Sequence, residues 1–136
     1  MKLPDLRASL MGDTSIYPGL RTSGSGGTTT GDWVDMDGSV GSVYGHFSNG
    51  VVSGSGSFAQ SLSCKLQEAD DNSGTGVQDV DGAAVPISEN KGWGLFRGVR
   101  TKRYVRAVVI NTVASSSTPN AVNDLSGAIF AEKARF

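Results

Sequence analysis

Residues suited to catalysis are few in this chain, which has one histidine, His46, and one cysteine, Cys64. A serine hydrolase needs a histidine beside its nucleophile and a nucleophile turn of the Gly-x-Ser-x-Gly type. The segment Gly54-Ser55-Gly56 lacks that flanking pattern, and His46 stands isolated as a surface or packing residue. Cys64 lies on the apolar side of an alternating run, which is typical of a buried and inert thiol. We therefore predict that the protein is not an enzyme.

Three carboxylates close together, Asp32, Asp35 and Asp37, raise the question of a cation site. They lack the loop register of an EF-hand, and the interleaved residues Trp33, Val34 and Met36 favour a strand with one acidic side. The glycine-rich segments 24–27 and 50–56 are not followed by the Gly-Lys-Ser/Thr of a phosphate loop. We predict no metal ion and no cofactor.

A run of cations at 97–106 is the strongest candidate for contact with a partner. Its charges, with nearby aromatic rings, could bind phosphates and stack bases. The net charge of −1 and the isoelectric point near 5.7 argue against nucleic acid. An acidic protein surface is the preferred partner, and a solvated hairpin rim is the structural alternative. The predicted contact residues are Arg97, Arg100, Lys102, Arg106, Trp93 and Phe96, while strand alternation aims Arg103 elsewhere.

The elements that position these residues read as β-strands. Apolar and polar residues alternate over 58–67, the period of a half-buried strand, and a polar turn follows at 70–74. Residues 76–80 are predicted to return as the second arm of a hairpin. The segment 103–113 is rich in β-branched residues and evenly apolar, so we expect it in the middle of a sheet.

Composition favours an all-β sandwich of about eight strands in residues 32–136, with little or no α-helix. The chain has 136 residues, of which 19 are glycine, and it is 18% charged, which suits one domain with many turns. The remaining strands are expected at 32–37, 40–47, 51–54, 93–96 and 124–131. Residues 1–31 are predicted to form an extended N-terminal arm and a flexible loop, because 23–31 is rich in glycine, serine and threonine.

The charges are unevenly distributed along the chain. Residues 1–90 carry eleven acids and four cations, whereas residues 91–136 carry eight cations and two acids. Such polarity suits copies that pack against one another, although it also serves simply to keep the surface of a domain hydrated. There is no apolar segment of the secretory or membrane-spanning kind, so we expect a soluble cytoplasmic product without membrane contact.

Taken together, the Leu66–Gly74 hairpin, its Val77-Gln78-Asp79-Val80 return and the strand Lys102-Arg103-Tyr104-Val105-Arg106 resemble the capsid decoration, or cement, proteins of tailed phages. The resemblance covers about residues 32–131. It implies a jelly-roll-like antiparallel β-sandwich that binds the major capsid protein from outside the virion, forms a homotrimer and is made in the host cytoplasm. Its departures are the glycine-rich stretch 38–57 and the end at Phe136.

Two other functional classes remain open. A receptor- or carbohydrate-binding sandwich, such as a head fibre or a tail or neck accessory protein, would use exposed aromatic residues such as Trp33 and Trp93. A hydrolase is disfavoured by the missing general base.

Overall fold

The computed structural model describes residues 10–23, 26–49, 59–88, 92–114 and 121–134. Within these residues the protein consists of β-strands and connecting turns, with no helix, as the composition predicts. The strands are β1 Leu10–Ser23, β2 Gly26–Thr30, β3 Val34–Asp35, β4 Ser39–Asn49, β5 Ala59–Ala69, β6 Gln78–Asp79, β7 Val85–Ser88, β8 Trp93–Gly98, β9 Tyr104–Ala114 and β10 Ala121–Lys133.

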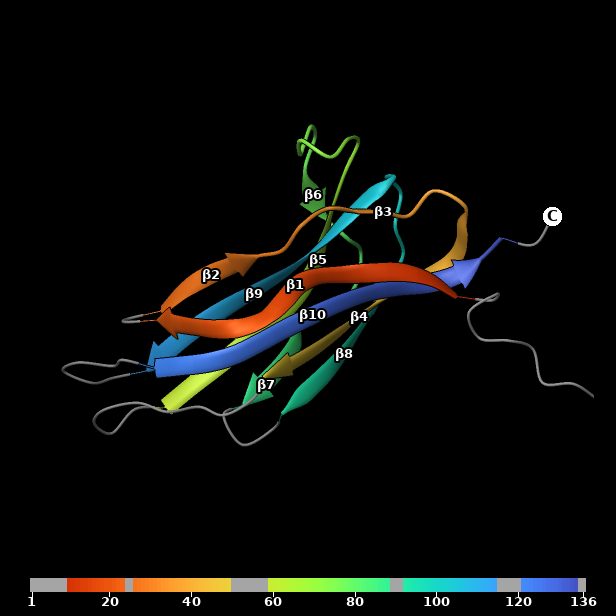
Figure 1. Ribbon diagram of the computed structural model, residues 1–136. Helices are drawn as coiled ribbons and strands as arrows, with labels where there is room; N and C mark the ends of the chain where they lie inside the picture. Colours follow the sequence, from red (N-terminus) through yellow and green to blue (C-terminus); the bar gives the residue numbers. More distant parts are fainter. Residues whose placement is uncertain (1–9, 24–25, 50–58, 89–91, 115–120, 135–136) are drawn as a thin grey trace, which may run out of the picture.

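The strands form two antiparallel sheets that face each other (Figure 1). The first sheet has the order β1-β10-β4-β8, and the second has the order β2-β9-β5, with β6 and β7 paired to β5 and β3 paired to β9. When the two-residue strands β3 and β6 are set aside, the chain alternates between the sheets at every connection except β5 to β7. Eight strands connected in this way make a jelly roll, so the expected fold class is confirmed.

The expected N-terminal arm is wrong for the part of it that the structure describes. Strand β1 pairs with β10 from Leu10↔Glu132 to Ser23↔Ala121, and β2 pairs with β9, so this segment supplies two of the eight main strands. Both strands lie at the edge of their sheet, where one ladder of hydrogen bonds suffices. An edge tolerates Pro18 and the two register shifts of β1, which hide its strand pattern in the sequence. Residues 1–9 and 24–25 lie outside the described residues.

The other predicted elements have mixed outcomes. The hairpin is confirmed, since Glu68 pairs with Gln78 across β5 and β6, and β9 lies between β2 and β5 as expected. The strand predicted at 32–37 shortens to β3. The strand predicted at 51–54 lies outside the described residues.

Glycines on the inner side of the first sheet make room for two phenylalanine rings. Phe47 stands in register between Gly127 and Gly94, and Gly45 is the cross-strand partner of Phe96. A Cβ at Gly45 would lie 2.8 Å from Leu66 Cδ2 of the opposite sheet, so a larger residue there would push the sheets apart. Gly45, Gly94 and Gly127 therefore serve core packing within strands and not turns.

Candidate binding surface

The six residues predicted to contact a partner do not form one site. Along β8 the side chains alternate in burial, with Trp93 58% exposed and Phe96 0% exposed. Phe96 belongs to the hydrophobic core, so the prediction that it contacts a partner is wrong. The reason is the period of two along a strand, which aims residues at odd and even positions to opposite sides.

Arg97 and Arg100 lie near each other in sequence but have different roles. Arg97 is exposed on the outer side of β8, and its Nε donates to Ser42 Oγ at 3.2 Å. Arg100, in the turn after β8, donates from Nε to Ser39 Oγ at 2.9 Å and from Nη1 to the Lys102 carbonyl at 3.0 Å. Arg100 thus ties the turn after β8 to the start of β4, and of these two arginines it is Arg97 that projects from a sheet face.

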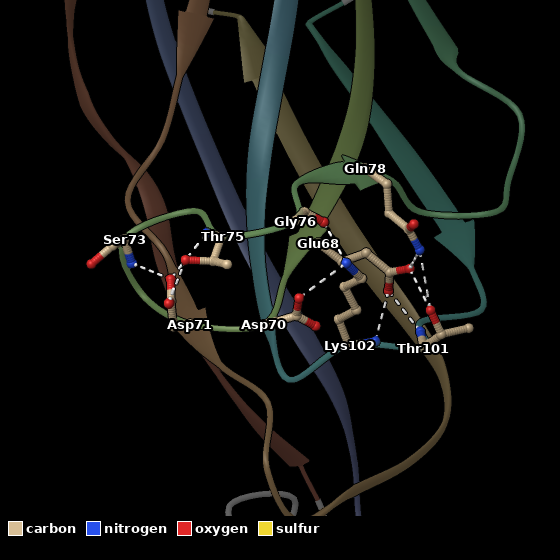
Figure 2. A network of polar contacts seen from close by, with 9 residues as sticks. All are labelled: Glu68, Asp70, Asp71, Ser73, Thr75, Gly76, Gln78, Thr101 and Lys102. Carbon is tan, nitrogen blue, oxygen red and sulfur yellow. Dashed lines mark hydrogen bonds and ion pairs between the residues drawn. The ribbon is translucent and has the colours of Figure 1, made fainter.

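A buried carboxylate, Glu68, organises the turn that carries Lys102 (Figure 2). Glu68 is 1% exposed, and its two oxygens accept hydrogen bonds from Gln78 Nε2 at 2.7 Å, Thr101 Oγ1 at 2.7 Å, Thr101 N at 2.6 Å and Lys102 N at 3.1 Å. Burial alone would raise the pKa of Glu68, but these hydrogen bonds outweigh it and hold the pKa below its ordinary value. The carboxylate therefore stays ionised and acts as a structural anchor.

The side chain of Lys102 closes the same network from its other side. Its Nζ lies 3.3 Å from Asp70 Oδ2 and donates to the Gly76 carbonyl (Figure 2). The adjoining turn is held by Asp71, which accepts from Thr75 Oγ1 at 2.6 Å and from Ser73 N at 2.9 Å. The hydroxyl of Thr75 is the main cause of the lowered pKa of Asp71. Lys102 therefore stabilises its own chain.

The cations at the start of β9 are also engaged within the chain. Arg103 makes two bonds to Asp35, at 2.9 and 2.8 Å, and its side chain lowers the pKa of that carboxyl to about 2. Arg106 donates to Gln67 Oε1 from Nε at 3.1 Å and from Nη2 at 2.9 Å, and its guanidinium lies 4.4 Å from the centre of the Trp33 ring. The acidic and basic parts of the sequence thus meet inside one molecule, so their polarity does not require a second copy.

The outer side of the first sheet carries a group of exposed rings that the sequence analysis did not bring together. We call this surface the aromatic face; its principal residues, from β4, β8 and β10, are Tyr44, His46, Trp93, Leu95, Arg97 and Phe130. Tyr44 and Phe130, partners in register, stack with centroids 5.3 Å apart and planes at 13°. His46 and Trp93 stack at 6.1 Å and 10°. The alternation Tyr44-Gly45-His46-Phe47 could have predicted part of this face, because it places Tyr44 and His46 on the same side of the strand.

A shallow hollow of about 370 Å³ lies at the β1 side of the aromatic face. It lies beside Phe130, whose register partner on β1 is Gly12. Its lining residues are Leu10, Met11, Gly12, Asp13, Thr14, Ala128, Ile129 and Phe130. The hollow makes this edge of the sheet surface concave.

Groups that could support other chemistry have structural roles. No cluster of three histidine, cysteine or carboxylate side chains able to hold a metal ion occurs in the part of the chain that the structure describes. Cys64 is buried as predicted, and burial raises the pKa of its thiol to about 12. No helix among the described residues is long and apolar enough to cross a membrane.

No protein-family model and no curated protein matches the sequence. Among solved structures, a chain from the structure of infectious bursal disease virus, Gx strain, has a similar fold, with a TM-score of 0.53. The two chains are 12% identical; the match covers 91% of this chain and 32% of the viral chain. The chain thus spans about a third of the viral one, and the likeness shows a shared antiparallel β-sandwich fold.

Proposed function

We propose that the protein is a structural component of a virion that binds the outside of a phage capsid and cements adjacent major capsid proteins. The observation that carries the proposal is the jelly roll itself, an architecture that recurs in viral capsid domains. The likeness to a chain of a virus structure and the resemblance of the hairpin and β9 to decoration proteins point the same way.

Cementing requires no active site. A protein that binds only the assembled lattice stabilises it by mass action, and contacts on both sides of a seam add to the effect. Of the predicted contact residues, Trp93 and Arg97 are the ones that project from the aromatic face. Arg100, Lys102 and Arg106 hold turns and strands of their own chain, so we do not assign the capsid contact to them.

The test uses capsids of the virus that encodes this chain, prepared without it. Purified protein is added at increasing concentration, and occupancy is measured by electron cryo-microscopy together with the thermal stability of the capsid. We expect saturable density on the outer surface and a raised temperature of capsid disruption. Absence of that density, or its presence at the tail alone, would contradict the proposal.

A receptor- or carbohydrate-binding role is the second candidate, and the exposed Trp93 ring supported by His46 favours it. Jelly rolls also occur in lectin domains. A glycan array probed with the wild-type protein and with Trp93→Ala tests this role. Binding of a sugar that is lost in the variant would favour it over cementing.

A further inference from the structure

We propose that the aromatic face is the contact surface between two copies of this chain, related by a two-fold axis. The proposal goes beyond attachment to a capsid, because it concerns the association of the protein with a second copy of itself. Oligomerisation as a trimer, which the family resemblance implies, is a different arrangement and an alternative outcome of the test below.

The first argument is the concentration of exposed apolar surface. Five of the eight large apolar side chains that are exposed in the described part of the chain belong to this side of the first sheet or continue its outward alternation. They are Leu10, Val40, Trp93, Leu95 and Val99. The rings of Tyr44 and Phe130 lie among them. A contiguous apolar patch of this kind on a soluble domain marks an interaction site.

The second argument is that several polar side chains of the face are bonded to one another. Ser48 Oγ and Ser126 Oγ lie 2.9 Å apart in a hydrogen bond with each other, and Arg97 donates to Ser42. A sugar needs hydrogen-bonding groups that converge around its hydroxyls, whereas Ser48 and Ser126 of this face already bond each other. A flat apolar sheet instead fits a second sheet, since aligned sheets pack face to face about 10 Å apart.

The third argument is self-complementarity. A two-fold axis that lies in the interface, parallel to the strands and between β10 and β4, places β8 of each copy over β1 of the other. The cross-strand register then sets Leu95 of one copy above the hollow of the partner subunit, beside Gly12 and Thr14. In the same way Tyr44 lies above Phe130 of the partner subunit. The two-fold axis repeats the contact between Leu95 and the hollow, so it occurs twice in the dimer.

Charge follows the same symmetry. Charged residues on the outward side of this sheet include Arg97 on β8 and Glu132 on β10, and Asp13 of β1 lines the hollow. The two-fold arrangement places Arg97 of each copy over Gly12 of the partner subunit, next to Asp13 of the partner subunit. Glu132 of the partner subunit lies one strand over and two residues further along, so Arg97 points toward two carboxylates. Opposite charges placed in this way favour the pair and set its register.

The first experiment is analytical ultracentrifugation of the wild type, Leu95→Asp and the control Val77→Asp. Leu95 and Val77 are 45% and 46% exposed, and Val77 lies outside the face, in the turn before β6. We expect the wild type and Val77→Asp to pass from monomer to dimer with the same midpoint concentration. We expect Leu95→Asp to raise this midpoint about tenfold or more, which corresponds to about 1.4 kcal/mol. Equal midpoints for all three proteins, a wild type that stays monomeric, or a trimer would overturn the proposal.

A charge exchange tests the register of the two copies. Arg97→Glu and Glu132→Arg are each expected to weaken the dimer through like-charge contact, and the double variant is expected to restore it. Thermal unfolding of every variant verifies that the monomer remains folded. Failure of the double variant to recover would overturn the two-fold register proposed here.

Capsid attachment is measured separately on the same variants. A Leu95→Asp protein that stays monomeric but still decorates capsids would separate self-association from cementing. Loss of decoration with an unchanged dimer midpoint would count against the proposed contact between copies.

Discussion

The two outer faces of the sandwich differ in how their side chains find partners. On the second sheet, Lys65 pairs with Asp79 at 2.9 Å, and Arg106 bonds Gln67 and covers the Trp33 ring. On the first sheet, the outward side chains are mostly aromatic and aliphatic, and they stack or stand exposed. Strands of the same kind thus build one face whose polar groups pair within the chain and one that leaves apolar surface exposed.

The comparison teaches that the density of charge in a sequence is a poor guide to a binding surface. The cation run of 97–106 attracted attention because it is concentrated, but most of its members neutralise nearby acids or bond turn carbonyls. Apolar rings spread over β4, β8 and β10 are dispersed in sequence and come together only in the sheet. The following predictions test this division, from the largest expected effect to the smallest.

Phe96 and Trp93 lie in the same strand and point to opposite sides, so their truncation is expected to act on different properties. Phe96→Ala removes a fully buried ring and is expected to lower the free energy of unfolding by about 3–5 kcal/mol. Trp93→Ala is expected to change it by about 0.5 kcal/mol or less, because the ring is exposed. Urea unfolding of both variants measures the contrast. Similar losses for the two would mean that Trp93 also belongs to the packed core.

Glu68 is expected to be the most costly polar side chain of the second sheet. Glu68→Gln places an amide N–H group among donors and is expected to lower the free energy of unfolding by about 2–3 kcal/mol at neutral pH. Gln78→Ala, which removes a single donor to this carboxylate, provides a milder comparison. Indistinguishable stability of Glu68→Gln and the wild type would contradict the anchoring role.

The same carboxylate gives the stability a pH dependence. The folded pKa of Glu68 lies below its unfolded value of about 4.3, so its contribution is complete above that pH and is lost as the pH falls through the folded pKa. We expect the free energy of unfolding to decrease with acidification below about pH 4.3, and to decrease less in Glu68→Gln. Equal slopes in the two proteins, measured by denaturant unfolding at several pH values, would argue against this origin.

Arg106 is expected to contribute less, because its contacts lie at a partly exposed surface. Arg106→Ala loses two hydrogen bonds to Gln67 and the contact with the Trp33 ring, for which we expect about 1 kcal/mol. The fluorescence of Trp33 reports the lost contact directly, if Trp93 is first replaced by phenylalanine. An unchanged emission spectrum would show that the guanidinium does not cover this ring.

Arg97→Glu is expected to have the smallest effect on stability, about 0.5 kcal/mol or less, because the residue is exposed and bonds one serine. Its effect is expected in the contact between copies instead. Arg100→Glu is a poor companion for this test, since it breaks the bonds that join the turn after β8 to the start of β4. A large loss of stability in Arg97→Glu would place Arg97 among the structural cations.

Local pattern was enough to predict several elements of this fold. The alternation of residues 58–67, the polar turn after it and the β-branched run of 103–113 predicted β5, its hairpin and the central strand β9. These signals work because a strand repeats every two residues and a turn depends on a few neighbouring side chains. The burial of Cys64 followed from the same alternation.

Other features depended on contacts between distant parts of the chain. Strand β1 is defined by its pairing with β10, at the far end of the described chain. Its proline and register shifts hide the strand pattern in the sequence until that pairing is known. The Tyr44–Phe130 stack and the Arg103–Asp35 pair likewise join separate segments. The sequence by itself determined an all-β chain with a hairpin, a central strand and no evident catalytic centre. Only the tertiary structure decided which cations form ion pairs and hydrogen bonds within the chain and which aromatic rings share a face. Sheet order and strand register determine those neighbours.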